Sequence, residues 1–508
     1  MDLSEKELLS NLSVLKDSEL LFERGIFPES TYIFKHALTR EVVYDSILAR
    51  RKKGLHDDIG NAIEELHKDN LGEHYGVLAE HYIISENYEK GANYCRLAAK
   101  NAEEKISIKE CVAYSEKRVA CIERLTQTEE VQKKLIDART ALGLYYVNIN
   151  GHSEAKEAVS PIIDLAKKRG NKRRLAQIHT ILGTYYFGVE ENYPMSFKHF
   201  EEALKISKEV KDIVSSVLAS AWFGIALGYD CDFKKASYYM EEAIKINAAA
   251  NALWGVAAMK SHLSLIVYNY SGKGNHGFRV SEEAVQIAEK SGDQLSKSMA
   301  YVSHGASFFY RRFLEDAIKY LLNGTDLCER VNNIMWSAGG HAFLGDIYFE
   351  IGEYQKSKDH FGQAIQVSEQ NKIWSSCINC WKIALANAKV MMNEKDIDLE
   401  LFYSYAAENR VKLYDGLTAR YIAEILSNFD NHYMNEAEVW IKKSIEADKR
   451  NGMMWHLASD YAVYGDLLKR QSDLSSAKEN LTKAIEIFKE CGADGWVEKY
   501  EKELAALL

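Results

Sequence analysis

Residues 344–364, LGDIYFEIGEYQKSKDHFGQA, carry the pattern that decides the fold. A Leu-Gly-x-x-Tyr segment around Gly345 is followed by Ser357, Phe361 and Ala364, which are spaced by four and three residues. Offsets of three, four and seven place side chains on one face of a helix. A small side chain on that face lets a neighbouring helix approach closely, and the apolar side chain fills the remaining space. The stretch therefore predicts two antiparallel helices packed against each other.

This pattern recurs about every 40 residues along most of the chain. The first small residue of the second helix returns at Ala155, Ser196, Ala236, Gly277, Ala317, Ser357, Ala437 and Ala477. The glycine of the first helix returns at Gly143, Gly183, Gly224, Gly305, Gly345 and Gly465. Glycine inside a helix costs about 1 kcal/mol relative to alanine, so its return at one register indicates that close packing offsets the cost.

The pattern resembles the tetratricopeptide repeat (TPR), which has a usual period of about 34 residues. Nine copies fit between about residues 136 and 490, with a period of about 40 residues. The resemblance implies an all-α, right-handed solenoid of about nine helix pairs, whose helices of about 16 residues span roughly 24 Å. Trp496, Tyr500 and Leu504 predict a capping helix with one apolar face over residues 491–508.

Two copies depart from the pattern. The fourth carries the glycine-rich run SGKGNHG at residues 271–277, where its helices should turn. In the seventh copy Ile397 takes the place of the first small residue, and Leu401 and Ser404 follow in the expected register. We expect irregular turns in these two copies.

The first part of the chain is organised differently. Residues 1–70 do not follow the period, and we expect residues 71–135 to form TPR-like transition helices. Residues 32–34 predict a short strand, and the helix after it has an apolar side made of Leu38, Val42, Ile47 and Leu48. A second helix is predicted through Leu55, Ile59, Ile63 and Leu66.

This N-terminal segment resembles multidomain class III adenylate/guanylate cyclases, in which an AAA-type or STAND-type ATPase leads through a winged-helix-like piece into a TPR array. The resemblance is carried by the runs FKHALTRE at residues 34–41 and LAEHY at residues 78–82, together with Tyr44, Leu55-His56 and YEKGA at residues 88–92. It implies a winged-helix-like N-terminal piece and a regulatory region without the catalytic and ATPase domains. The sequence leaves open whether the chain is a natural protein or part of a larger one.

Composition narrows the function classes. The chain has 508 residues, 47% of them apolar and only 3 proline, which favours a helical protein. A formal net charge of -10 disfavours nucleic acid as the main partner. The polar, acidic first residues and the lack of a long apolar run predict a cytoplasmic protein with no membrane partner. The oligomeric state is left open.

Motifs for catalysis, cofactors and metals are not recognisable. The sequence has no GxxxxGK[ST] phosphate loop, no HExxH and no GxSxG, so we expect no catalytic residues, no cofactor and no metal. Cys377 and Cys380 form a CxxC pair within a helical pattern, which favours packed thiols over a redox pair. The basic run KKRGNKRR at residues 167–174 is expected to form a solvated loop, with binding to an acidic partner as the alternative.

The concave surface of the array is the expected binding site. In TPR arrays the first helix of each pair lines this groove, and residues one and four positions after the packing glycine should face it. The predicted groove residues are Thr184, Phe187, Ile225, Tyr229, Tyr268, Asn269, Phe309, Tyr310, Asp346, Phe349, Glu350, Lys382 and Lys389. Tyrosine and phenylalanine with a few charges suit an extended peptide or helix.

Four functions follow for testing. The first is a non-catalytic interaction and regulatory module, which binds a partner or effector in the groove and acts on catalytic cyclase or ATPase domains. The alternative is a metabolite sensor with its ligand inside the superhelix, since aromatic faces stack on small molecules. An enzyme and an RNA-binding protein are less favoured, because catalytic motifs are missing and the chain is acidic.

Overall fold

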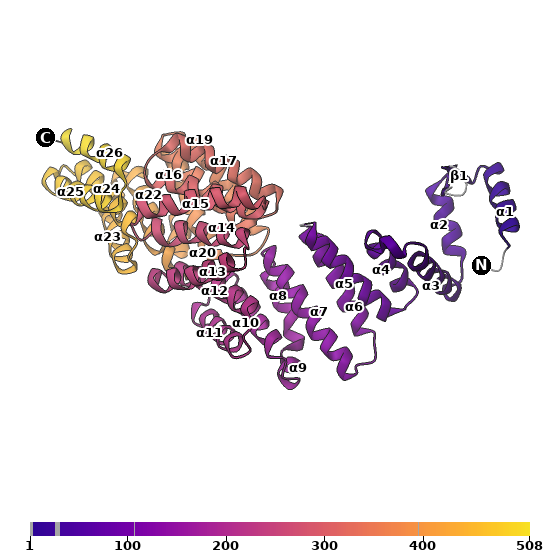
Figure 1. Cartoon of the computed structure of the whole chain (residues 1–508). Coiled ribbons are helices and arrows are strands. Elements are labelled where there is room, and N and C mark those ends of the chain that lie inside the picture. Colours follow the sequence, from indigo (N-terminus) through magenta and orange to yellow (C-terminus); the bar gives the residue numbers. More distant parts are fainter. Residues whose placement is uncertain (1–3, 26–30, 106, 395, 508) are drawn as a thin grey trace. The chain divides into compact units, whose positions relative to one another are not determined.

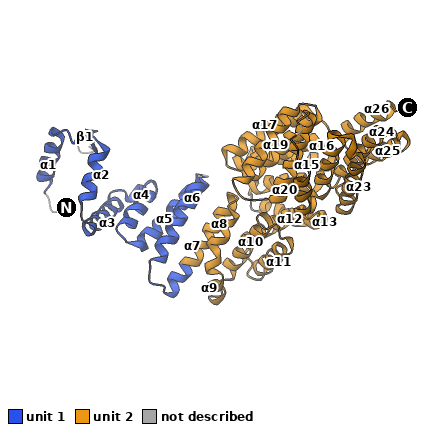
Figure 2. Ribbon diagram, turned by 180° about the vertical axis from the view of Figure 1, so that it is seen from behind, with its two compact units in different colours: residues 1–134 blue, residues 135–508 orange. Residues whose placement is uncertain are grey.

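In this computed structural model, the structure describes residues 4–25, 31–105, 107–394 and 396–507. Helices make up most of the described chain (Figure 1). The described residues contain one strand pair, which is short. Internal contacts divide the chain into two compact units, Met1–Lys134 and Leu135–Leu508, called unit 1 and unit 2 (Figure 2). The prediction of an all-α, TPR-like solenoid is confirmed.

Unit 1 begins with a small α/β segment and continues as helices. Its β1 and β2 pair antiparallel, with Leu21 opposite Phe34, so the predicted strand exists and has a partner that the sequence did not reveal. The apolar side predicted for α2 is not covered, because Leu38 is 71% and Val42 62% exposed. The bounds are α1 Glu5–Asp17, β1 Leu21–Arg24, β2 Thr31–Phe34, α2 Ala37–Ser46, α3 Ala49–Leu66, a 3-10 segment η1 Lys68–His74, α4 Tyr75–Ile84, α5 Tyr88–Glu104 and α6 Ile108–Glu123.

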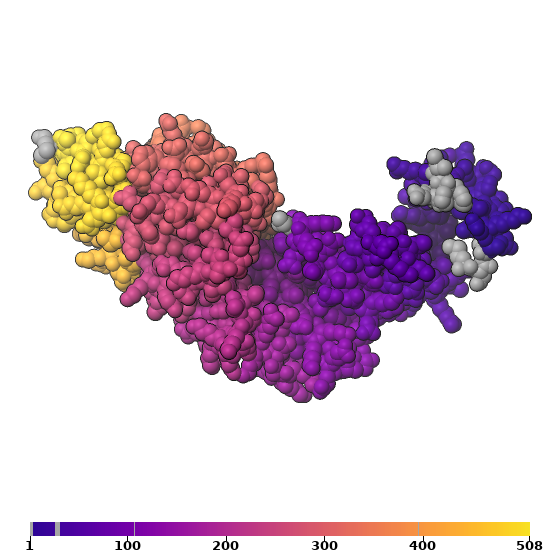
Figure 3. Space-filling view, in the orientation of Figure 1, coloured from indigo at the N-terminus to yellow at the C-terminus, as the bar shows by residue number. Residues whose placement is uncertain are grey.

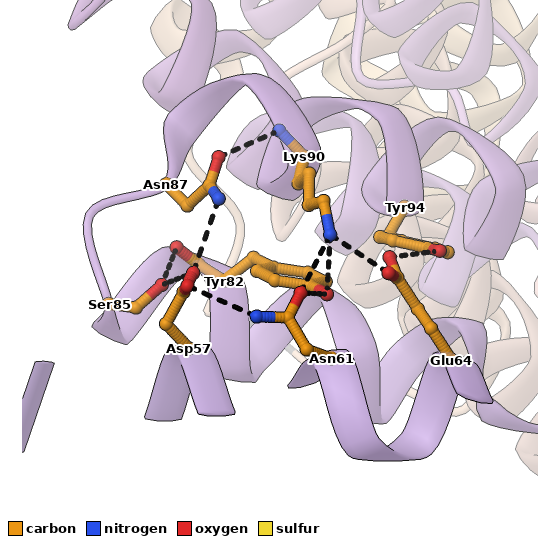
Figure 4. Close-up of polar contacts among 8 residues, drawn as sticks. All are labelled: Asp57, Asn61, Glu64, Tyr82, Ser85, Asn87, Lys90 and Tyr94. Carbon is orange, nitrogen blue, oxygen red and sulfur yellow. Dashed lines mark hydrogen bonds and ion pairs between the residues drawn. The ribbon is translucent and has the colours of Figure 1, made fainter. Parts of the chain in front are cut away.

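A polar cluster joins α3 to the α4–α5 pair (Figure 4). The Lys90 ammonium donates to Glu64 at 2.8 Å and to Asn61 and the Tyr82 hydroxyl at 2.9 Å. The Tyr94 hydroxyl donates to Glu64 at 2.6 Å. The remaining members of the cluster are Asp57, Ser85 and Asn87. The ammonium has three acceptors, which equals its number of donors, so the cluster is a structural clamp.

Unit 2 and the helix that leads into it form nine helix pairs between residues 129 and 491 of the described chain, as the repeat predicts (Figure 1). The helices of the regular pairs have 16 to 18 residues, about one turn more than a usual TPR helix. The first helices are α7 Glu129–Asn148, α10 Lys172–Gly188, α12 Ile213–Tyr229, α14 Leu253–His262 with η3 Leu263–Asn269, α16 Gln294–Tyr310, α18 Ile334–Glu350, α20 Ser375–Met391, α22 Asp415–Phe429 and α24 Met454–Arg470. The second helices are α8 His152–Val159 continued by η2 Ser160–Ile162 and α9 Ile163–Lys168, then α11 Tyr193–Glu209, α13 Phe233–Ala249, α15 Gly274–Ser291, α17 Leu314–Arg330, α19 Tyr354–Glu369, α21 Leu399–Glu408, α23 Met434–Asn451 and α25 Leu474–Cys491, and α26 Asp494–Ala505 follows.

The glycine column has the predicted physical cause. A Cβ added to Gly345 would lie 2.8 Å from the ring of Phe361, and one added to Gly183 would lie 2.6 Å from the ring of Phe200. Both phenylalanines are the apolar residue between the two small ones of their second helix, and both are almost fully buried. The missing side chain thus makes room for the neighbouring aromatic ring, which accounts for glycine inside these helices.

We expect Gly345→Ala to lower the free energy of unfolding by about 1–3 kcal/mol, because the new methyl group must displace the Phe361 ring. The matched control is Gly339→Ala in the same helix, where a Cβ meets nothing within 4 Å. That control should raise the stability by about 0.4–1 kcal/mol, because alanine has the lower entropy in the unfolded chain. Urea unfolding followed by circular dichroism measures both, and equal effects of the two substitutions would contradict the packing argument.

The two irregular copies differ from the regular pairs in helix type and in register. In the fourth pair the first helix ends in the π-helical turn η3, and the predicted glycine-rich turn follows it. In the seventh pair the predicted register is wrong, because Leu401 is 42% exposed, Ser404 is exposed and Phe402 is buried instead. The inward face of α21 is therefore shifted by one residue from the regular register.

Pairs that are distant in sequence also contact one another in unit 2. The backbone N–H of Trp374 donates to the carbonyl of Gly188 at 2.9 Å. The indole N–H of Trp455 donates to the carbonyl of Tyr310 at 3.0 Å, and that of Trp496 to Phe309 at 3.1 Å. The C-terminal helices adjoin the middle pairs in the space-filling view (Figure 3). These contacts cover part of the concave inner surface of the array. The groove expected from the sequence is therefore reduced to a central cavity.

Candidate functional site

Unit 2 contains a cavity of about 320 Å³, which is lined by the inner faces of the first helices. Its walls come from α12, η3, α16, α18, α20, α22 and α24, and α26 adds a further wall. Many of the lining residues are aromatic, including Tyr270, Phe309, Tyr310, Phe343, Tyr421 and Trp455. A volume at the lower end of ligand pockets, with an apolar lining and a few charged groups, is typical of a binding site for a small ligand.

Six of the predicted groove residues lie together at this cavity: Tyr229, Phe309, Tyr310, Asp346, Phe349 and Glu350. They lie on α12, α16 and α18, near the C-terminal end of each helix. Counting from the packing glycine thus gave residues of the cavity lining on α16 and α18.

Three predicted residues are core residues instead. Thr184 and Phe187 are fully buried and Ile225 is 3% exposed. The Thr184 hydroxyl donates to the carbonyl of Ile181 at 2.8 Å, and the Phe187 ring packs edge-on against Tyr229 with 5.3 Å between ring centroids. The groove prediction is wrong for these residues, because neighbouring helices cover this part of α10 and α12.

The remaining four predicted residues also lie outside the cavity lining. Asn269 is 1% exposed and donates to the Ser307 hydroxyl at 3.0 Å, while the Tyr268 hydroxyl donates to a carboxylate on α13. The π-helical turn changes the direction of both side chains from the one that a regular α-helix gives. Lys382 forms an ion pair with Glu369 at 2.7 Å, and Lys389 is half-buried on α20.

The polar lining residues that sequence reasoning missed lie on α22 and α26. Arg420, Tyr421 and Glu424 lie on α22 and line the cavity, as does Lys499 on α26. Their spacing of three to four residues on α22 is the signal that could have found them. The groove count did not reach them, because it takes residues one and four positions after the packing glycine, and all three precede the corresponding position, Ile425.

Arg420 is at the centre of a buried ionic group. Its guanidinium lies 2.9 Å from a carboxylate oxygen of Asp460 and donates to Nδ1 and the carbonyl oxygen of His456 at 3.2 Å. Burial, and next to it the charge of Asp460, raise the pKa of Asp448 well above its usual range. Burial also holds the pKa of His456 well below its usual range.

Two further carboxyl groups face the cavity without an ion-pair partner among the described residues. Asp346 accepts a hydrogen bond from the Tyr421 hydroxyl at 2.5 Å, and Glu424 accepts one from the Asn387 amide at 2.6 Å. Burial raises the pKa of Asp346 to about 6 and the pKa of Glu424 to about 7. Both groups therefore titrate near neutral pH, which is common at functional sites.

The CxxC pair and the basic run have structural roles. Cys377 lies in the first turn of α20 rather than inside it, and its thiol contacts the Tyr414 hydroxyl at 3.0 Å. Burial raises the pKa of Cys377 well above its usual range and that of Cys380 to about 12, so both are protonated thiols. In the basic run, Arg173 pairs with Asp212 at 3.2 Å and Arg174 with Asp137 at 2.6 Å. Within the described ranges, no three His, Cys, Asp or Glu side chains gather as a metal site.

Comparisons with known proteins assign the chain to no family. No family model matches the chain, and no curated protein matches it. A solved structure of a Rap protein complexed with competence and sporulation factor is similar, at 11% identity and a TM-score of 0.49, over 76% of this chain and 99% of that one. A STAND protein with a tetratricopeptide repeat sensor from Pyrococcus horikoshii is similar at 16% identity and a TM-score of 0.46, over 82% of this chain and 60% of that one. Yeast Tom70 is similar at 11% identity and a TM-score of 0.34, over 88% and 96%. In the part of the chain that the structure describes, no helix is long and apolar enough to cross a membrane.

Proposed function

We propose that the chain is a non-catalytic regulatory module that binds an effector in the central cavity of unit 2 and passes the bound state to a protein partner. The observation that carries the proposal is the cavity itself, a space of about 320 Å³ lined by aromatic rings and two carboxyl groups that titrate near neutral pH. Its walls come from the first helices of seven successive pairs and from α26. Filling the cavity therefore changes the packing between pairs that are distant in sequence. Such a change can reach a partner bound elsewhere on the array.

The choice between a small effector and an extended peptide follows from the same geometry. Contacts such as Trp374 to Gly188 and Trp455 to Tyr310 leave a partly open cavity in place of a long groove. A volume of this size suits a small molecule or a single peptide side chain better than a helix or several residues of an extended strand.

The resemblance of residues 34–41 and 78–92 to class III cyclases supports a finer proposal. The regulated partner is then a cyclase or ATPase domain, linked to this chain or separate from it. Titration of such a catalytic domain with the chain, with and without effector, tests this part. A cyclase rate that stays constant under all these conditions contradicts it.

Effector binding is tested by blocking the cavity. Gly339 lies in the cavity wall, and a Cβ there meets nothing within 4 Å, so Gly339→Met places a side chain in the open space. A ligand at 100 times its dissociation constant adds about 2.7 kcal/mol to the stability. Thermal unfolding with a panel of metabolites should therefore show a higher melting temperature for the unmodified chain and no shift for Gly339→Met. Equal shifts in both chains, or no shift in either, contradict the proposal.

A further inference from the structure

The cations that line the cavity already have carboxylate partners. Arg420 is neutralised by Asp460 at 2.9 Å. Lys499 lies 2.7 Å from Glu350, and the same carboxylate accepts Arg312 at 3.0 Å. An anionic ligand would therefore have to compete with a carboxylate that is already bound to each of these cations.

The carboxyl groups of Asp346 and Glu424 are different, because only neutral groups donate to them. Tyr421 and Asn387 supply one hydrogen bond each. A carboxylate has about four lone-pair sites, so each group keeps acceptor capacity that is not used by a described residue. Both side chains are half-buried and line the cavity. The charge of Arg420 acts on both groups, but no described cation donates a hydrogen bond to either of them.

Aromatic rings surround the same space. Tyr310 lies 5.9 Å from Tyr270 and 4.8 Å from Trp455, measured between ring centroids, and 6.0 Å from Phe343. The faces of aromatic rings carry negative charge density and attract ammonium and guanidinium groups, most strongly where water is excluded. The aromatic rings and the carboxyl groups therefore both favour a positively charged ligand.

From this arrangement we infer that the cavity binds an organic cation, whose alkylammonium or guanidinium group lies between Asp346 and Glu424 and against the aromatic rings. The inference rests on the proposed function and names the chemical class of the effector. The group can belong to a free amine or to a lysine or arginine side chain of a peptide, since both present the same chemistry.

The affinity should rise with pH. Burial raises the pKa of Asp346 to about 6 and of Glu424 to about 7, so the empty cavity holds protons below these values. A bound cation favours the ionised forms and releases the protons, so binding strengthens by on the order of 10–100-fold between about pH 5.5 and pH 8. The titratable and charged groups that face the two carboxyls from neighbouring elements are Tyr270, Tyr310, Cys380, Arg420, Tyr421, Asp460 and Tyr500.

The test uses the full chain and matched probes in isothermal titration calorimetry at pH 8. The free cations are n-butylammonium and n-butylguanidinium, with n-butylurea as the neutral isostere and butyrate as the anion. The peptide arm compares acetyl-Gly-Arg-Gly-amide with its citrulline counterpart. We expect the cations to bind at least about tenfold more tightly than their neutral isosteres, and tighter binding of the peptide assigns the group to a peptide side chain.

Two charge-neutral variants complete the test. Asp346→Asn and Glu424→Gln should each weaken cation binding by about tenfold or more, whereas Glu479→Gln, on the exposed face of α25, should leave it unchanged. Full affinity in both cavity variants, or absence of binding by every cationic probe up to about 10 mM, overturns the inference. Binding of butylurea or butyrate that Gly339→Met abolishes overturns the cation inference and leaves the proposed function in place.

Discussion

Replacing Arg420 with methionine is expected to lower the free energy of unfolding of unit 2 by about 3–5 kcal/mol, among the largest effects of a single substitution in this chain. The Arg420 side chain is 8% exposed and that of Asp460 is not exposed at all. Methionine fills a similar space but leaves the Asp460 carboxylate without its cation. The cost arises from that uncompensated charge, not from the loss of the ion pair as such.

The loss should depend on pH with a definite sign. Burial already raises the pKa of Asp460 in the folded state, and removing Arg420 takes away the group that lowers it. A group with a raised pKa in the folded state contributes stability at low pH that is lost as the pH rises through that pKa. Arg420→Met should therefore be more destabilising at pH 8 than at pH 5.

Two further variants make the prediction specific. Arg420→Met combined with Asp460→Asn should regain much of the stability, because no unpaired charge remains. Arg470→Met removes an exposed ion pair with Asp466 and should change the stability by less than about 1 kcal/mol. Urea unfolding followed by tryptophan fluorescence measures all three, and a change for Arg420→Met no larger than that for Arg470→Met would refute the assigned role of the buried pair.

The fold could be predicted from the sequence because its signal is local. Gly345 and Phe361 are 16 residues apart. The regular copies repeat this packing with a glycine and an apolar residue 16 or 17 residues apart. In a repeat array each unit mainly contacts its neighbours, so the period alone determines most of the packing. The register failed in α21, where the period is interrupted and Phe402 replaces Leu401 at the inner face.

The cavity could be predicted only in part, because contacts between distant pairs leave no periodic signal. The bond from Trp374 to the Gly188 carbonyl joins α20 to α10, and nothing in either repeat indicates the other. Phe309 and Asp346 were found because they lie four residues and one residue after a packing glycine. Arg420 precedes the corresponding position in α22, Ile425, and required the three-dimensional structure.

Trp455 lines the cavity and also forms a contact between pairs that are distant in sequence. Its replacement by alanine is the second change with a large expected effect. It is 4% exposed, its ring lies 5.5 Å from those of Phe309 and Trp496, and its N–H satisfies the carbonyl of Tyr310 across 145 residues of sequence. Trp455→Ala leaves a large void and a buried carbonyl without a donor, which together should cost about 3–5 kcal/mol.

The same substitution should also open the wall of the cavity. Trp455→Phe keeps most of the apolar contact and loses the hydrogen bond, so it should cost less than alanine, about 1–3 kcal/mol. Trp254→Ala, at a tryptophan that is 56% exposed, is the matched control and should stay within about 0.5 kcal/mol of the unmodified chain. Chemical unfolding by circular dichroism measures stability, and butylguanidinium affinity at pH 8 measures the cavity. Because the contact joins α24 to α16, a stable Trp455→Ala chain with unchanged affinity would show that pairs distant in sequence do not hold the cavity together.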